Sequence, residues 1–217
     1  MTGHFDATAT NSPASGLDPV EIFSRIGRLP IVGRTFQQHV LDEIVGDAAG
    51  GRGRVLLLSG EAGSGKSRLM SEACRLTSER NGLALHADCL VEAGAPPYDV
   101  WVRALRKLPD ATAVHLLEGS ALPEGTIPYS SWRPRSMSAE ETRFRLHSDV
   151  LGALEQTSKH GPLLLALDDL QWADSPSLQL FRFIAQRIET LSLALIGALR
   201  SEECPPESEL GRLVDDL

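Results

Sequence analysis

The chain has 217 residues, which is enough for one sizeable α/β domain with its own core. It carries 21 Lys and Arg against 29 Asp and Glu, a net charge of -8, which argues against broad electrostatic contact with DNA or another polyanion. Cys74, Cys89 and Cys204 show neither CxxC spacing nor metal-binding spacing to His, so they predict core or near-surface thiols in a cytoplasmic protein. No stretch approaches the ~20 apolar residues that span a bilayer, so we expect no membrane contact.

The N-terminal part of the chain differs in composition from the rest. Residues 1–19 are rich in Thr, Ser, Ala and Gly and have no apolar period, which predicts a disordered tail before an ordered core over residues 20–217. The first strand we expect is Val55–Ser59, whose continuous apolar run is typical of a parallel strand buried on both faces. Apolar residues at helical spacing follow it: Leu69, Met70, Ala73 and Leu76.

Later segments alternate between short apolar runs and amphipathic stretches. The further strands we expect are residues 83–90, 162–167 and 193–199. The further helices we expect are one with apolar positions Val100, Trp101, Ala104, Leu105 and Leu108, one over 139–157 that buries Phe144, and one capped by Ser175. Residues 109–138 show no clear period. The alternation predicts an α/β fold with a parallel sheet and helices on both of its faces, without fixing the strand order.

A phosphate-binding motif stands between the first strand and its helix. GEAGSGKS, from Gly60 to Ser67, matches GxxxxGK[ST], in which glycines let backbone N–H groups converge on phosphate oxygens. Lys66 adds a charge for the β- and γ-phosphates, and the Ser67 hydroxyl can ligate Mg2+. A glycine-rich turn that binds nothing is the alternative. The predicted ATP contacts are Gly60, Glu61, Ala62, Gly63, Ser64, Gly65, Lys66, Ser67 and Arg68.

Two carboxylates follow a later apolar run, in LLLALDDLQWAD. They would lie at the carboxyl edge of a parallel sheet, where such folds bind their ligands. We predict that Asp168 holds Mg2+, usually through water, and that Asp169 orients or deprotonates the attacking water. The alternative is that both residues begin a turn and cap the next helix.

Four segments together carry a family resemblance: IVGRTFQQ, GEAGSGKS, DDLQWADSPSLQLF and IGALR. They resemble STAND-type P-loop ATPases related to AAA+ and, more narrowly, the ATPase module of large ATP-binding LuxR-type transcriptional regulators, from about Pro30 to the C-terminus. The resemblance implies a three-layer P-loop NTPase fold. It also implies that Val32, Gly33 and Arg34 lie against adenine and ribose, that Arg200 senses the γ-phosphate as a catalytic residue, and that Trp172 packs under the magnesium-binding turn. Thr35 and Phe36 stand where such proteins often have an acidic residue.

The resemblance also bears on the end of the chain. Proteins of this kind continue into a fifth strand and a helical lid, and the regulators continue further into a DNA-binding domain. This chain stops at ELGRLVDDL. We therefore expect a fragment, a truncated piece, or a short relative that lost its output domains, in each case without the C-terminal strand and lid. We expect no direct nucleic acid contact by this chain, and ATP-dependent self-association.

Three functions are compatible with these motifs. The first is a nucleotide-switch module of a bacterial signal-transducing transcriptional regulator that binds ATP or ADP with Mg2+ and hydrolyses ATP slowly. The second is a small-molecule kinase, and the third is the same module attached to a nucleotide cyclase or a protein kinase. No segment after the phosphate loop offers an obvious acceptor-binding cluster, which favours the first function.

Overall fold

The computed structural model describes residues 33–90, 95–108, 112–120 and 138–217. The predicted tail over residues 1–19 and the predicted nucleotide contact of Val32 lie outside these residues. Most of the stretch over residues 109–138, which shows no clear apolar period, also lies outside them.

Four parallel strands form the sheet, in the order β1-β4-β3-β2. They are β1 (Arg54–Ser59), β2 (Leu83–Asp88), β3 (Leu163–Asp168) and β4 (Leu193–Leu199). Two parallel strands cannot be joined by a tight turn, so the connections between successive strands contain helices. The predicted α/β class with a parallel sheet is confirmed.

The structure corrects three expectations about the strands. β2 ends at Asp88 rather than Leu90, and β3 runs from Leu163 through Asp168. Every residue of β3 and β4 is buried, whereas the apolar residues of β1 are only half-buried. The prediction that β1 is buried on both faces is therefore wrong, because within the described residues β1 lies at the sheet edge with β4 as its partner.

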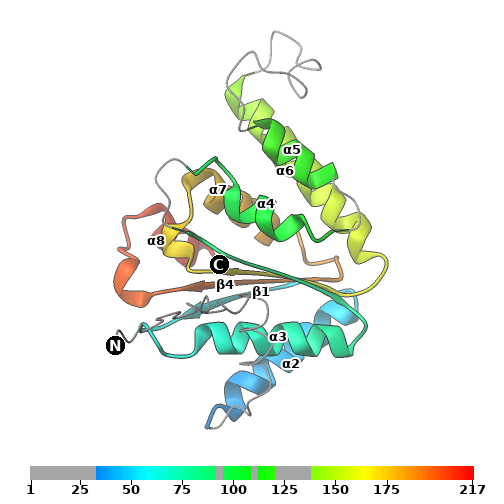
Figure 1. The fold of residues 1–217 in the computed structure, drawn as a ribbon, viewed down its shortest axis with the longest axis vertical. Coiled ribbons are helices and arrows are strands. Elements are labelled where there is room, and N and C mark those ends of the chain that lie inside the picture. The colour runs from blue at the N-terminus through cyan, green and yellow to red at the C-terminus, as the bar shows by residue number, and fades with distance from the viewer. Residues whose placement is uncertain (1–32, 91–94, 109–111, 121–137) are drawn as a thin grey trace, which may run out of the picture.

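Two helices cover one face of the sheet, α2 (Thr35–Ala49) and α3 (Lys66–Glu79) (Figure 1). Met70 and Ala73 of α3 are completely buried, as the helical spacing after the phosphate loop predicts. They pack with Leu41 of α2 and with Ala166 and Ile196 of the central strands. We did not predict α2, which buries only Leu41, Val45 and Ala48.

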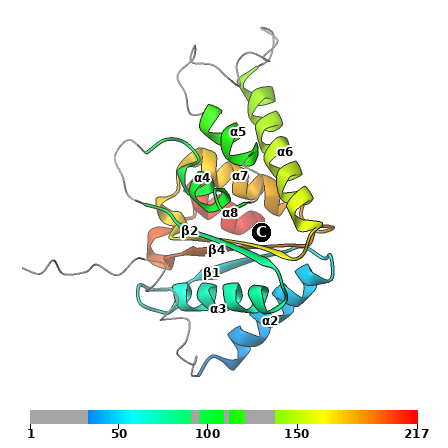
Figure 2. The ribbon, with the colours of Figure 1, turned by 45° about the vertical axis from the view of Figure 1, so that its right-hand side comes forward.

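The other face carries α4 (Asp99–Leu105), α6 (Ala139–Ser158), α7 (Ser175–Ala185) and α8 (Glu209–Asp216). Figures 1 and 2 show α6 and α5 (Thr112–Ser120) extending away from the sheet side by side. Phe144, which we expected on the buried face of α6, is therefore 58% exposed, because no strand lies beneath this end of the helix. Its ring meets the ring of Phe183 edge to face, with centroids 5.6 Å apart.

The start of α7 differs from the prediction by one residue. Asp174, not Ser175, caps the helix, because Asp174 Oδ1 accepts a hydrogen bond of 2.9 Å from the Ser177 N–H. Ser175 is the first helical residue. An aspartate at this position satisfies an N–H group that has no partner within the helix and places a negative charge at the positive end of the helix dipole.

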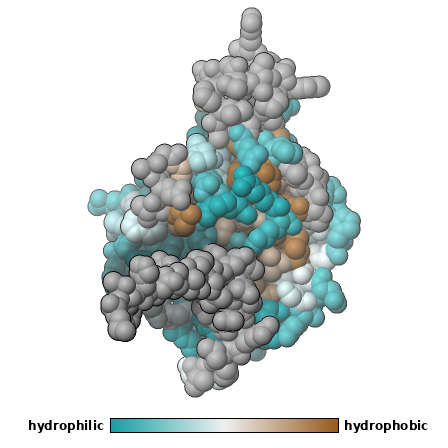
Figure 3. Space-filling model, in the orientation of Figure 1, coloured by the Kyte–Doolittle hydropathy of each residue, from teal (hydrophilic) through white to brown (hydrophobic). Residues whose placement is uncertain are grey.

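The surface agrees with the composition. On the face seen in Figure 3, hydrophilic residues cover most of the described surface and hydrophobic residues form small separate patches. None of the helices in the described ranges combines the length and the apolar composition that crossing a membrane requires.

Candidate nucleotide site

The phosphate-loop motif forms the connection from β1 to α3, at the carboxyl end of the sheet. Gly63 and Gly65 have φ angles of 73° and 87°, in the left-handed region where a side chain is disfavoured. A Cβ on Gly60 would lie 2.9 Å from Ser64 Oγ, so a side chain there would force the Ser64 hydroxyl to shift. α3 begins at Lys66, so its first N–H groups and its positive dipole end face the loop.

Lys66 lies folded against its own loop. Its Nζ donates hydrogen bonds to the carbonyl oxygens of Gly60, at 2.8 Å, and Glu61, at 2.9 Å. An ammonium group has three N–H donors, so these two contacts leave one donor for a further acceptor. The side chain is held at the mouth of the loop by backbone groups alone.

Ser67 joins the loop to the acidic end of β3. Its hydroxyl donates to Asp168 Oδ2 at 2.6 Å, between residues 101 positions apart. Asp168 is 4% exposed, and its Oδ1 accepts from the Asp169 N–H at 2.8 Å. Hydroxyl and carboxylate oxygens are hard ligands of the kind that Mg2+ prefers, so the pair fits the predicted metal site.

Asp169 takes part in a second cluster, which reaches the end of β4. Its φ of 54° turns the chain away from the strand, and its Oδ1 accepts from Gln171 Nε2 at 2.7 Å. Arg200 Nε lies 3.7 Å from the same oxygen. Gln171 Oε1 accepts from the Arg200 N–H at 3.1 Å, so this one amide connects the two strand ends. The sequence interpretation missed Gln171, whose only signal was its position two residues after the second aspartate.

Arg34 lies against the phosphate loop. Its guanidinium donates to the Ser64 carbonyl, and a Cβ placed on Gly65 would lie 3.5 Å from Arg34 Nη2. Gly33 precedes it with a φ of 74°. Contact of Gly33 and Arg34 with adenine and ribose stays a prediction.

The remaining predicted loop residues differ in exposure. Glu61, Ala62 and Gly63 are exposed at the tip of the loop. Arg68, in the first turn of α3, is half-buried, and its Nη1 has no hydrogen-bond partner among the described residues. Ser67 itself is exposed as a residue, and its hydroxyl oxygen, which donates to Asp168, can still accept or coordinate through its lone pairs.

Trp172 does not pack under the acidic turn. The 3-10 helix η2 (Leu170–Trp172) buries Leu170 to 1% exposure, whereas Trp172 is 42% exposed. Leu170 fills the space above Gly197 of β4, where an added Cβ would lie 2.5 Å from Leu170 Cδ1. The expectation for Trp172 was wrong because the smaller side chain fits under the turn.

Two histidines that no sequence motif singled out, His86 and His147, lie in polar clusters. His86, Asp88 and Asp168 each offer one potential ligand atom, and these three atoms lie within 4.8 Å of one another. On the other side of the sheet, the Tyr98 hydroxyl and His147 Nε2 form a hydrogen bond of 3.1 Å. Burial lowers the pKa of His147 to about 4, so this imidazole is uncharged at neutral pH.

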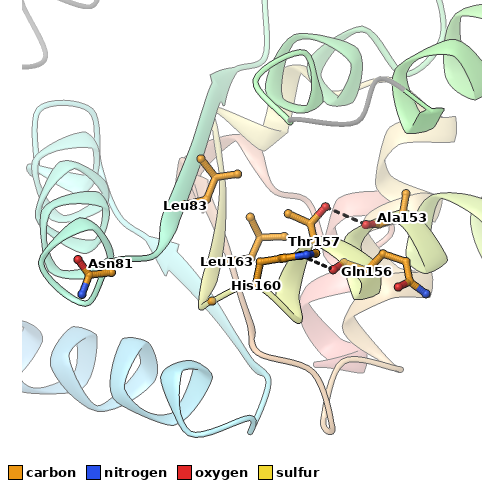
Figure 4. Close-up of a pocket in the computed structure, with 8 residues that line it drawn as sticks. Asn81, Leu83, Ala153, Gln156, Thr157, His160 and Leu163 are labelled. Atoms are coloured by element: carbon orange, nitrogen blue, oxygen red, sulfur yellow. Dashed lines mark hydrogen bonds between the residues drawn. The ribbon is translucent and has the colours of Figure 1, made fainter.

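A separate pocket opens at the opposite edge of the sheet, where Leu83 and Leu163 begin β2 and β3 (Figure 4). It encloses about 370 Å3 beside the C-terminal end of α6, and His160 Nδ1 bonds to the Gln156 carbonyl at 3.1 Å. Because this pocket lies at the amino ends of the strands, it is separate from the phosphate loop.

Comparison with known proteins agrees with this geometry. Residues 30–196 match the model of the AAA ATPase domain, so the chain belongs to that family. An uncharacterized protein of Rhizobium meliloti (strain 1021) is 27% identical over 204 residues, which are 85% of this chain and 20% of that protein. The chain thus spans about a fifth of the length of this relative.

Two solved structures are also similar, each at 18% identity over 87% of this chain. One is a DNA replication initiation factor, with a TM-score of 0.45 and 44% of that chain covered. The other is Drosophila ORC bound to DNA, with a TM-score of 0.46 and 42% of that chain covered.

Proposed function

We propose that this chain binds ATP together with Mg2+ and hydrolyses it slowly, as the nucleotide-switch module of a bacterial signal-transducing transcriptional regulator. The observation that carries the proposal is the 2.6 Å hydrogen bond from the Ser67 hydroxyl to Asp168 Oδ2. It brings together the phosphate-loop serine and the buried strand-end carboxylate, which are the two protein groups that hold Mg2+ in P-loop ATPases. A glycine-rich turn without a ligand offers no reason for this pairing.

The surrounding side chains divide the chemistry between them. Loop N–H groups and the Lys66 ammonium bind phosphate oxygens. Ser67 and Asp168 would hold Mg2+, which would supply positive charge against the phosphates. Asp169 accepts the proton of the attacking water while the bond between the β- and γ-phosphates breaks. Arg200, 3.7 Å from Asp169, stabilises the charge on the γ-phosphoryl group as it passes to water and ADP leaves.

The regulator role rests on the sequence resemblance and on size. The chain spans 20% of its curated relative, which leaves room for output domains in a longer protein. A net charge of -8 favours DNA contact through such a domain rather than through this chain. Three free cysteines are compatible with the cytoplasm, and we propose ATP-dependent self-association there.

Magnesium dependence of ATP binding tests the proposal. Titration with a fluorescent ATP analogue, with Mg2+ and with a chelator, should show tighter binding with Mg2+ for the parent and little difference for Ser67→Ala or Asp168→Asn. Ser71→Ala is the matched control, because Ser71 Oγ donates a hydrogen bond of 2.9 Å to the Ser67 carbonyl and takes no part in the predicted Mg2+ site. A parent chain that binds no ATP, or variants with undiminished Mg2+ dependence, would refute the assignment.

Phosphate release separates the switch from a small-molecule kinase. A switch releases phosphate to water alone, so the rate should not change when candidate acceptors are added. A rate that depends on an acceptor, with the phosphoryl group recovered on it, would favour the kinase.

A further inference from the structure

The carboxyl ends of β2 and β3 place a histidine and two aspartates on one face of the sheet. In the parallel register Asp88 is opposite Asp168, and His86 is opposite Ala166. The intervening Leu85, Ala87, Leu165 and Leu167 all belong to the core on the α4 and α7 side. Because strand side chains alternate, His86, Asp88 and Asp168 share the face that α3 covers.

The spacing of these three side chains suits a metal ion. One ligand atom from each lies within 4.8 Å of the other two, and His86 Nε2 is 3.6 Å from Asp88 Oδ1. Two ligands at about 2.1 Å from a tetrahedral ion are separated by about 3.4 Å. The Asp88 side chain is about half-exposed, so a small rotation can close the remaining gap, while His86 and Asp168 are held by burial.

The charge balance at this place also favours a cation. Among the described residues, neither Asp88 nor Asp168 forms an ion pair with Lys or Arg. The nearby Arg103 and Lys107 instead contact backbone carbonyls, those of Asp88 at 2.6 Å and His86 at 3.4 Å. Two facing carboxylates repel each other unless a positive charge lies between them.

The imidazole adds a neutral nitrogen donor to the carboxylates. The His86 side chain is largely buried beside the two aspartates, and an unprotonated imidazole nitrogen offers a lone pair to a metal ion. A mixed set of one imidazole and two carboxylates suits a first-row transition ion better than Mg2+, which prefers oxygen ligands and retains water.

We propose that His86, Asp88 and Asp168 form a binding site for a divalent transition-metal ion, with Mn2+ preferred over Mg2+. The site includes Asp168, which the proposed Mg2+ site also uses. Any role of this ion with bound nucleotide therefore rests on the proposed function, whereas binding of the ion to the nucleotide-free chain does not.

Titration of the nucleotide-free full chain with Mn2+, followed by the electron paramagnetic resonance signal of free Mn2+, tests this site. Mn2+ is the probe because it has little affinity for thiols, so the three cysteines do not contribute. We expect one ion per chain, displaced only by a large excess of Mg2+. His86→Ala and Asp88→Asn should each weaken Mn2+ binding at least tenfold.

His39→Ala is the matched control, because His39 Nε2 lies 3.3 Å from Glu43 in an exposed pair on α2. It should leave Mn2+ affinity unchanged. If His86→Ala fails to fold, the Mn2+ affinities of His86→Gln and of Asp88→Asn, at a half-exposed residue, test the site instead. Unchanged Mn2+ affinity in the folded His86 and Asp88 variants, or equal affinities for Mn2+ and Mg2+, would overturn the proposal.

Nucleotide binding in the same samples distinguishes this proposal from the proposed function. Lys66→Ala should lose ATP affinity and keep Mn2+ affinity, since the Lys66 ammonium bonds to the carbonyl oxygens of Gly60 and Glu61 and not to the three proposed ligands among the described residues. A parent chain that binds Mn2+ through His86 but binds no ATP would retain this metal site and refute the ATPase assignment.

Discussion

The phosphate loop and the acidic end of β3 differ in how far along the chain their contacts reach. Lys66 bonds to Gly60 and Glu61, six and five residues away. Asp168 instead accepts from a serine 101 residues away, and Gln171 connects to Arg200 across 29 residues. The Lys66 contacts can form within a local turn, whereas the contacts of Asp168 and Gln171 exist only when the sheet is assembled. Nucleotide affinity should therefore depend mainly on the first region and turnover on the second.

The largest effect that this comparison predicts is on turnover. Asp169→Asn should reduce phosphate release by about 100-fold, because it removes the group assigned to accept the proton of water. Binding of Mg-ATP should stay nearly unchanged, whereas Asp168→Asn should weaken its Mg2+ dependence. Single-turnover phosphate release and analogue titration measure the two quantities. Asp42→Asn, which breaks an exposed ion pair with Arg80, is the control. If the Asp168 and Asp169 variants behave alike, the two aspartates do not have the separate roles assigned to them.

Lys66→Ala should produce the next largest effect, a loss of ATP affinity of at least tenfold. The ammonium is the main side-chain charge that the loop offers to the β- and γ-phosphates, and ~1.4 kcal/mol already corresponds to a factor of ten. Titration with a fluorescent ATP analogue measures it. Lys159→Ala, at an exposed residue 3.7 Å from Glu155, should bind like the parent. Equal affinities for Lys66→Ala and the parent would rule out the phosphate-loop assignment.

Gln171→Met should lower turnover about fivefold without changing ATP affinity, since the loss of about one hydrogen bond to Asp169 costs ~1 kcal/mol. Gln171→Glu keeps the acceptor for the Arg200 N–H but places a second carboxylate beside Asp169, so the pH profile of turnover should move to higher pH. Gln179→Met, on α7, should have the parental rate and profile. If both Gln171 variants keep the parental profile, Gln171 does not position Asp169.

The smallest predicted effect lies outside both regions, at the buried Tyr98 and His147 pair. The pKa of His147 is about 4 in the fold and near 6.5 in an unfolded chain, so the unfolded chain binds more protons between these values. The stability from neutral His147 is fully present above pH 6.5 and is lost as pH falls toward 4. Lowering the pH from 7 to 6 should cost about 0.7 kcal/mol through this group.

Urea unfolding at pH 7 and pH 6 measures this loss. His147→Leu should unfold with less change between the two pH values than the parent. Tyr98→Phe should keep the pH dependence and lose about 1 kcal/mol from the missing hydrogen bond. A parental pH dependence in His147→Leu would assign the effect to other groups.

Local patterns predicted the parts of the molecule that depend on a few neighbouring residues. The spacing of Leu69, Met70 and Ala73 predicted α3, and the apolar runs before Gly60 and Asp169 predicted β1 and β3 within a residue or so at each end. These features follow from the alternation of side chains in strands and from 3.6 residues per helical turn, both of which are visible in the sequence. The two predicted site segments lie at one edge of the sheet for the same reason, since both follow parallel strands.

Tertiary structure decided the rest, because it depends on which elements become neighbours. β1 is only half-buried because it lies at the edge of the sheet. Phe144 is exposed because its end of α6 extends away from the sheet, and Leu170 rather than Trp172 is buried because the space above Gly197 fits the smaller side chain. No sequence motif singled out His86. Its cluster combines Asp88, two residues along the same strand, with Asp168, which lies 82 positions away and becomes a neighbour only through the pairing of β2 with β3. The sequence by itself determined the phosphate loop and the strand-end carboxylates. Only the order of the strands could place these groups against Gln171, Arg200 and His86, because contacts between neighbouring strands leave no periodic signal along the chain.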